Sequence, residues 1–452
     1  MAFPRYLPLT AVAVTLLAGC AYAVTVAPSI TWQHSATDSG ELAAAAYSFG
    51  VPHPTGYPLW LLLATPWARL PLGADVAGRL NWLSATCAAL AAGLLTVVTT
   101  LLVNQASPSG RPDTRVAAAD VGASPPAHSL LAGATAGVAL LTATGVWNVA
   151  VVTETYTLHL LLLVALLGAG LLGWRQRRRA LLGGLALANH VTVLPVAAAA
   201  LLAGHGRTRL RPINLLWLAP GLSLYLLLPW RAFSHPASNW GDPETAGAFW
   251  ALVSGSAYHY LLVWPDLTDG LTRLVATLHA LVTQFPLPFW PLALAGLPAL
   301  YSIGRLWLLV ATLYLLLPVF YRAAGVEHYL LPDLALLALA AGLGANRIAG
   351  SLAQWRLPAP ALPWLLLAVL TVPALILGAR TSSLRGEDSA RQWATQLLHS
   401  ARPGDELLTT DDEETFALWY VQRVEGVRPD VVVVDERLLQ QPWYRRQLNA
   451  YH

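Results

Sequence analysis

Charged side chains are scarce in this 452-residue chain: they make up 11% of it, whereas a soluble domain carries about 25%. Lysine is absent, so every basic residue is arginine, which we interpret as compositional bias rather than function. The only cysteines, Cys20 and Cys87, lie in apolar segments, which argues against a disulfide framework. The sequence also lacks an internal repeat, a Gly-rich phosphate loop and any His or Cys spacing typical of a metal site.

The chain instead contains long apolar runs, and hydrophobic residues make up 56% of it. That composition predicts a polytopic α-helical membrane protein. The first apolar run ends in Leu-Ala-Gly-Cys, like a bacterial lipoprotein cleavage site, but its length over residues 7–27 favours an uncleaved first helix. Arg5 before it indicates a cytoplasmic N-terminus.

Arginines in short connections indicate the inner side of the membrane. One cluster, RQRRR at 175–179, precedes an apolar segment about as long as one span, and further arginines at 207–211 follow it. A single crossing would place one of the two clusters on the wrong side. A broken hairpin over residues 180–203, with Asn189 and His190 at its tip, resolves the conflict. Counting each half of the hairpin, the sequence predicts roughly eleven membrane segments.

Composition divides the chain into a transmembrane domain at residues 1–379 and a tail at residues 380–452. Outer loops are predicted at residues 28–79 and 231–285 of the first part. We expect the tail to be a small soluble extracytoplasmic α/β domain.

Within the tail, the pattern of apolar residues reads strand–helix–strand. It predicts a strand near Leu407, a helix over residues 413–424 and a buried strand over residues 430–434.

Ionisable residues gather where the predicted segments reach the outer face. Such residues are costly at membrane depth and are therefore functional candidates. The first outer loop contains TDSGELAAAAYSFGVPHPTGYPLW at residues 37–60, with Asp38, Glu41 and His53. Candidates from later segments are Glu154, Tyr156, Asn189, His190, Arg231, Trp240, Asp242, Arg322, His328 and Tyr329.

These candidates have structural alternatives. Asp38 and Glu41 have the spacing of a capping box, and for Glu41 helix capping is as good an interpretation as catalysis. His53 lies between prolines and could serve a rigid turn. The polar tip of the hairpin could merely satisfy its own backbone, and Asp242 could belong to a Pro turn.

A carboxylate on the first outer loop can act as general base towards an acceptor hydroxyl. Arginine and histidine at helix ends can hold a lipid phosphate through charge-assisted hydrogen bonds. A phosphate leaving group stabilised in this way needs little further chemistry from the protein. The pattern therefore predicts group transfer from a phosphate-linked lipid to an acceptor outside the membrane.

The opening stretch resembles the first outer loop of the GT-C superfamily of integral membrane glycosyltransferases, which use polyprenyl-phosphate sugars. More narrowly, the chain resembles the family whose eukaryotic member is a protein O-mannosyltransferase acting on plexin-type receptor domains. Further matching stretches follow in order along nearly the whole chain: VTETYTL at 152–158, GLALANHVTVLP at 184–195, LPWRAFSHPASNWGDPET at 228–245 and LWYVQRVEGVRPDVVVVDERLL at 418–439.

The resemblance implies a GT-C architecture and an inverting transfer, in which a single displacement moves the sugar. The sugar is expected to be a hexose such as mannose. The catalytic role falls on Asp38, with Glu41 second. The resemblance and the outer-face pattern together make His53, Asn189, His190, Arg231, Arg322, His328 and Tyr329 the candidates for binding the donor phosphate or sugar. Glu154, Tyr156, Trp240 and Asp242 are secondary candidates.

We expect a bacterial cytoplasmic membrane, with the active site on its extracytoplasmic face. The acceptor stays open among protein, glycan and lipid, as do a divalent metal and the oligomeric state. No tightly bound cofactor and no nucleic-acid partner are expected. The rival interpretation is a transporter or flippase of lipid-linked sugars, which broken helices and polar residues would also fit. A membrane scaffold that presents the tail would leave Asp38, His53 and the hairpin tip without a role.

Overall fold

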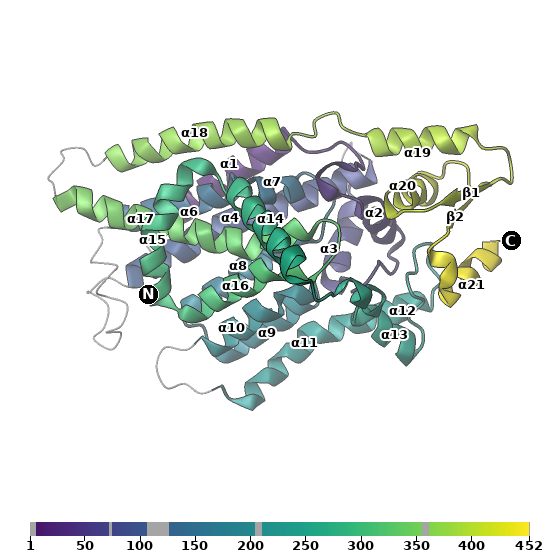
Figure 1. Cartoon of the computed structure of the whole chain (residues 1–452), viewed down its shortest axis with the longest axis horizontal. Coiled ribbons are helices and arrows are strands. Elements are labelled where there is room, and N and C mark those ends of the chain that lie inside the picture. Colours follow the sequence, from purple (N-terminus) through teal and green to yellow (C-terminus); the bar gives the residue numbers. More distant parts are fainter. Residues whose placement is uncertain (1–5, 72–74, 106–125, 204–209, 355–360, 452) are drawn as a thin grey trace.

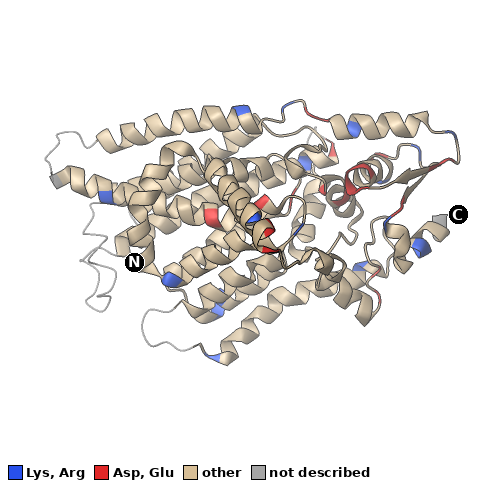
Figure 2. Cartoon of the chain, viewed as in Figure 1, with Lys and Arg blue, Asp and Glu red and all other residues tan. Residues whose placement is uncertain are grey.

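The computed structural model describes residues 6–71, 75–105, 126–203, 210–354 and 361–451. Most of the long helices run side by side in a bundle, and the tail sits at one end of it (Figure 1). Helix α4 (Val76–Gln105) contacts α1 (Leu7–Ala23), α6 (Pro126–Leu141) and α8 (Tyr156–Leu171). Helix α17 (Leu331–Gln354) closes the other side of α6. Figure 2 shows that most carboxylates lie towards the end of the bundle that carries the tail, whereas arginine predominates at the opposite end.

Four helices in the described residues are long and apolar enough to cross a membrane. They are α4, the run 212–232 of short helices that ends in α12 (Leu227–Ala232), the run 326–353 that contains nearly all of α17, and α18 (Leu362–Ser382). Two bent pairs raise the number to six if each pair is one span. The predicted count of roughly eleven also included shorter apolar helices, such as α16 (Arg305–Phe320), and stays a prediction.

The apolar run at residues 129–147 predicts a single straight crossing, but the structure bends within it. Helix α6 ends at Leu141, and α7 (Thr144–Ala150) continues at an angle of 62° to it. The carbonyl oxygen of Leu141 accepts a hydrogen bond from the buried hydroxyl of Tyr22, 3.0 Å away. The bend brings the chain to Glu154 and the start of α8 at the tail end of the bundle.

The predicted hairpin consists of two helices, and these helices contact each other. Helix α9 (Gln176–Leu187) and helix α10 (Leu194–Leu202) are joined through Asn189, His190 and a turn of 3₁₀ helix. At the other end of the pair, the Arg179 guanidinium donates to backbone carbonyl oxygens at the end of α10. The polar stretch at residues 104–128, rich in Pro, Gly, Ser and Ala, predicts a loop. Most of it, together with Arg207 and Arg209, lies outside the described residues.

The segment predicted as an outer loop, residues 231–285, is largely helical. It contains α13 (Ala246–Val253), the 3₁₀ helix η5 (Ser256–Leu261) and α14 (Leu267–Gln284). Asp266 caps α14, because its Oδ1 accepts a hydrogen bond from the Asp269 amide at 2.9 Å. Helix α14 then meets the apolar segment of α15 (Trp290–Ile303) at an angle of 89°.

The tail begins with α19 (Ser389–Ser400). The strands β1 (Glu406–Thr409) and β2 (Val432–Asp435) follow, and α20 (Asp412–Arg423) connects them. The two strands pair in parallel. These elements occupy the residues of the predicted strand–helix–strand pattern, and α21 (Pro442–Tyr451) follows them. Two strands and one helix cannot bury much surface alone. The apolar face of α20 packs on α2 (Ser39–Ser48), so the tail and the first loop share one hydrophobic core.

Helices α15 and α17 pack at very close range because glycines face the partner backbone. A Cβ atom at Gly296 would overlap the carbonyl oxygen of Ala340, and one at Gly344 would overlap that of Leu292. Small residues permit such an approach between membrane helices, where van der Waals packing stabilises association.

We expect Gly344→Val to separate α15 from α17 and lower the thermal unfolding midpoint of the purified protein, as overpacking typically costs about 1–3 kcal/mol. Gly350→Val on the same helix is the matched control, since no atom lies within 4 Å of a Cβ built there. Equal midpoints for the two variants would contradict this account of the interface.

Candidate active site

Asp38 stands at the N-cap position of α2, but its side chain makes no capping hydrogen bond to that helix. About two fifths of the side chain is exposed (39%). Glu41 is almost fully buried and contacts His53 instead of the helix start. The structure therefore does not form the capping box that the spacing allowed, and the Asp38 carboxylate is left accessible.

The buried partner of Glu41 is His53, which it holds at two points. One carboxylate oxygen accepts from the His53 amide at 3.1 Å, and the other lies 2.8 Å from His53 Nδ1. On the far side of the ring, His53 Nε2 lies 3.0 Å from the Tyr57 hydroxyl and 3.6 Å from Asp38 Oδ2. The Tyr57 hydroxyl gives its own proton to the Pro54 carbonyl oxygen at 2.9 Å. Both ring nitrogens thus face acceptors, which suits an imidazolium.

The surrounding charges favour the same state. Burial by itself would lower the pKa of His53, but the carboxylates of Asp38, Glu41 and Glu154 outweigh it and raise the pKa to about 9. Glu154 lies between α7 and α8. Burial, reinforced by the charge of Asp38, raises the pKa of its carboxyl group well above the usual range. The charges around His53 therefore favour its protonated form, whereas the surroundings of Glu154 favour its neutral form.

A cluster of aromatic and histidine rings lies next to this group. Tyr156 of α8 is in ring contact with His190 at the hairpin tip, with centroids 5.2 Å apart, and with His328 at 5.0 Å. Tyr57 stacks on His190 at 5.6 Å, and Tyr329 lies 6.1 Å from Tyr156. Four segments far apart in the sequence meet here: the first loop, the start of α8, the hairpin and the 3₁₀ helix η7 (Val326–Leu330). We refer to these five residues as the ring cluster.

The hairpin tip contributes polar groups to the ring cluster. Nδ1 of His190 accepts from the Thr192 amide at 3.3 Å, so a neutral His190 carries its proton on Nε2, as a free donor. Asn189 is fully buried, and its Nδ2 donates to the Thr155 carbonyl oxygen at 3.4 Å. Its Oδ1 has no hydrogen-bond partner in the described part of the chain, so it can accept from a bound hydroxyl group.

Two arginines predicted to hold the donor phosphate have other contacts. The Arg231 guanidinium packs on the rings of Phe49 and Trp230, and its Nε donates to the Phe49 carbonyl oxygen at 2.5 Å. Arg322 pairs with Asp269 of α14 at 2.5 Å. Of the four charged or ionisable candidates Arg231, His190, Arg322 and His328, the two histidines lie in the ring cluster, whereas the two arginines make these other contacts.

Trp240 and Asp242 connect the site to the tail. The Trp240 ring lies 6.2 Å from that of His53 and packs on Phe416, Trp419 and Trp443. Asp242 pairs with a tail arginine, Arg446, at 2.9 Å. Both residues therefore support the site rather than line the ring cluster.

Sequence reasoning missed Tyr57, although it lies within the opening motif. Its backbone is left-handed, with φ at 40°, just before α3 (Pro58–Ala68). The Gly-Tyr-Pro sequence was the available signal, since Pro begins helices. It also missed Tyr258 of η5, where burial, reinforced by the charge of Asp38, raises the pKa well above the usual range.

One group of side chains has a metal-like composition. His235, Asp242 and Glu244 place three potential ligand atoms within 4.8 Å of one another. However, one oxygen of Asp242 accepts from Asn239 and the other pairs with Arg446, whose positive charge opposes a bound cation. These residues fit a metal ion poorly, and we derive no step through one.

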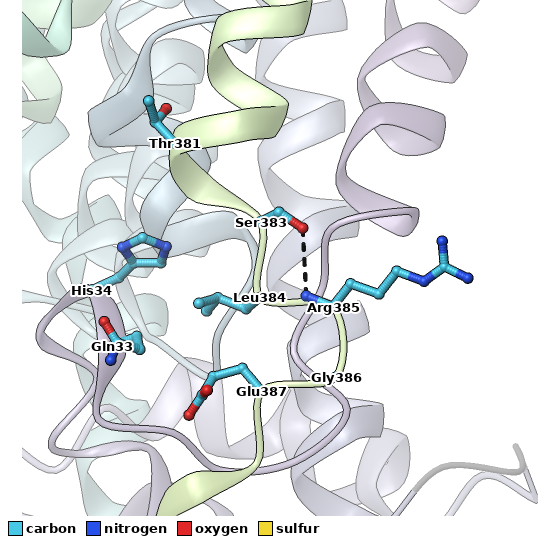
Figure 3. A pocket seen from close by; sticks show the side chains of 8 residues that line it. All are labelled: Gln33, His34, Thr381, Ser383, Leu384, Arg385, Gly386 and Glu387. Carbon is cyan, nitrogen blue, oxygen red and sulfur yellow. Dashed lines mark hydrogen bonds between the residues drawn. The ribbon is translucent and has the colours of Figure 1, made fainter.

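A separate polar cavity of about 330 Å³ opens where α18 ends. Figure 3 shows it between the turn at Gln33 and His34 and the chain from Thr381 to Glu387. His34 Nε2 lies 3.3 Å from the Ser382 carbonyl oxygen. None of the predicted site residues lines this cavity, so we do not assign the active site to it.

The fold itself is similar to that of a solved membrane protein. Nearly the whole chain (98%) superimposes on 92% of the crystal structure of ArnT from Cupriavidus metallidurans bound to undecaprenyl phosphate, with a TM-score of 0.57 and 14% identity. The apo structure of the same protein gives a TM-score of 0.54 at 15% identity, covering 96% of this chain and 90% of that one. The chain thus has the GT-C fold of an integral membrane protein.

Sequence comparison narrows this class to one family. Residues 38–209 match the Protein O-mannosyl-transferase TMEM260 N-terminal domain, and residues 390–452 match TMEM260-associated domain 2. The mouse protein O-mannosyl-transferase TMEM260 is 26% identical over 456 aligned positions, which cover 90% of this chain. The chain spans 60% of the length of that relative. It belongs to the family of membrane proteins defined by these two domains.

The charge state of His53 predicts a pH-dependent stability. Its pKa in the folded protein, about 9, lies above the ordinary value of 6.5. Protonation therefore stabilises the fold fully below the ordinary pKa, and that stabilisation is lost as the pH rises through about 9. Between about pH 7 and about pH 10, the thermal unfolding midpoint of wild type should fall more than that of His53→Gln, which cannot titrate. Parallel curves for the two proteins would contradict a charged His53.

Proposed function

We propose that this protein is an inverting glycosyltransferase that takes a sugar from a polyprenyl-phosphate donor, with Asp38 as general base. The observation that carries the proposal is the Asp38 carboxylate: it is accessible, bound to no helix amide, and backed by the buried pair of His53 and Glu41. A base needs such access to reach an acceptor hydroxyl. The adjoining ring cluster offers donors for a phosphate and aromatic faces for a sugar.

The comparisons support the two substrate classes. The related ArnT structure is bound to undecaprenyl phosphate, which favours a lipid-phosphate donor here too. The mouse relative is named a protein O-mannosyl-transferase, which favours mannose as the sugar and a protein hydroxyl as the acceptor. We therefore propose protein O-mannosylation as the reaction.

In the proposed reaction Asp38 removes the proton of the acceptor hydroxyl as its oxygen attacks the anomeric carbon. The bond from that carbon to the phosphate oxygen breaks, and the lipid phosphate leaves with the electron pair. A single displacement of this kind inverts the anomeric configuration. His53 is a positioning residue in this scheme: its charge lies 3.6 Å from Asp38, and Glu41 fixes its ring.

The leaving phosphate would be held by His190 and His328 of the ring cluster. Nε2 of a neutral His190 is a donor, because Nδ1 already accepts from Thr192. Asn189 Oδ1, which has no partner in the described part of the chain, can accept from a sugar hydroxyl. Donors already in place cost no reorganisation when charge develops on the leaving oxygen.

The distribution of charge supports a proposal for the side of the membrane on which the site lies. Arginine predominates at the end of the bundle away from the tail (Figure 2), and basic loops favour the cytoplasmic side. The carboxylates, the ring cluster and the tail would then lie on the extracytoplasmic side, where a bacterial enzyme meets a lipid-linked sugar and an acceptor.

Asp38→Asn is expected to lower turnover by about 10²- to 10⁴-fold, the usual contribution of a general base. Binding of the lipid donor should stay close to that of wild type, since Asp38 handles the acceptor proton. The assay measures release of polyprenyl phosphate and the glycosylated peptide product from polyprenyl-phosphate mannose. Asp430→Asn, an exposed carboxylate of the tail paired with Arg428, is the control and should keep full turnover. Wild-type rates in Asp38→Asn would exclude the assigned base.

The variants His328→Gln and Arg231→Gln test whether the donor phosphate is bound by the ring cluster or by Arg231. Loss of one hydrogen bond to a charged phosphate should weaken donor binding roughly 10- to 100-fold in His328→Gln. Arg231→Gln should leave donor affinity unchanged, because its guanidinium contacts Phe49 and Trp230. Donor titration of each purified variant gives the two constants. The reverse ranking would return the phosphate to Arg231.

A further inference from the structure

Helix α14 divides its surface into three lengthwise faces. Its large exposed apolar side chains recur every three or four residues, so they form one stripe along the helix. This apolar stripe consists of Leu267, Leu271, Val275, Leu278 and Val282.

A second exposed stripe runs beside the apolar stripe, because each of its residues directly follows one residue of the apolar stripe in the sequence. It consists of Thr268, Thr272, Ala276, His279 and Thr283, and four of its five side chains are polar. The remaining face is turned towards α16 and α17, and Thr277 on it is buried. One exposed flank of α14 is thus apolar and the other polar, with a sharp line between them.

The apolar stripe continues into neighbouring exposed apolar residues at both ends of α14. Before the helix, Trp264 has an exposed fraction of 91% and Tyr260 one of 75%. These are the residue types enriched where membrane meets water. After the helix, α15 exposes Leu294 and Tyr301 along an apolar segment of the membrane domain. Figure 1 shows α14 crossing obliquely in front of the long helices, on the outside of the bundle.

We propose that α14 lies along the boundary between membrane and water, with the apolar stripe against the acyl chains and the polar stripe against headgroups and water. A helix surrounded by water would not present a continuous apolar flank. The side-by-side stripes are the pattern of helices that lie in the plane of the interface. The occupant of the apolar stripe is therefore bilayer lipid.

This placement ties lipid contact to the candidate site. Asp269, on the third face of α14, pairs with Arg322, which lies shortly before η7 and its ring-cluster residue His328. Helix α14 also contacts η7 directly. A helix held by the bilayer thus supports the segment that carries His328, and the membrane surface sets the depth of the ring cluster.

Spin labels at single cysteines test the proposal in the full chain, with Cys20→Ala and Cys87→Ala as background, in nanodiscs of phosphatidylcholine and phosphatidylglycerol. Leu271→Cys and Val275→Cys sample the apolar stripe, while Thr272→Cys and His279→Cys sample the polar stripe. The measurement compares collisions with oxygen, which concentrates in acyl chains, and with a water-soluble nickel chelate. Leu309→Cys on the exposed face of α16 and Arg402→Cys in the tail serve as lipid and water references.

We expect the two apolar-stripe labels to favour oxygen like Leu309→Cys, and the two polar-stripe labels to favour the nickel chelate like Arg402→Cys. Chelate preference at all four positions would place α14 in water and overturn the proposal. Protection of the apolar-stripe labels from both reagents would also overturn it, because a second copy or another protein would then cover the stripe. Two positions on each stripe keep the test decisive if one variant fails to fold.

Discussion

The site depends on one contact: the Glu41 carboxylate binds both the backbone amide and the ring of His53. A carboxylate buried this deeply is costly unless its oxygens are satisfied, and here the amide and the ring of one histidine satisfy both. The arrangement fixes the loop between α2 and α3 as well as the imidazole. It also leaves Asp38 as the more exposed of the two carboxylates. Two acids three residues apart therefore have different duties, set by burial.

The residues around this pair come from the ends of helices rather than from their middles. Glu154 precedes α8, Asn189 and His190 separate α9 from α10, and His328 lies in the turn before α17. Helix ends expose backbone groups and accept irregular turns, so polar side chains can converge there without breaking a helix. The long helices supply the rigid frame that brings these ends together, and small residues such as Gly296 keep the frame tight.

Much of this arrangement could be predicted from the sequence, because charge and apolar length carry the topology. The hairpin at residues 180–203 was inferred from the two arginine clusters, and Asp38, His53 and His190 were grouped as candidates for one site. The contacts of Arg231 and Arg322 could not be predicted, since side-chain direction and partner choice depend on tertiary packing. The sequence likewise gave no sign that Glu41 would bind His53, because the same spacing suits a capping box equally well. The residues of helix α14 were predicted to belong to the outer loop at 231–285, whereas the structure shows a helix there.

The shared core of tail and first loop has a consequence for the synthesis of the chain. His53 emerges from the ribosome early, but the aromatic side chains that pack behind Trp240 belong to residues 416–443 and follow more than three hundred positions later. Until they arrive, the outer surface of α2 and Trp240 stays uncovered. An interrupted chain would therefore insert its helices and yet lack the aromatic packing behind the candidate site, which is complete only after the tail has folded onto the first loop.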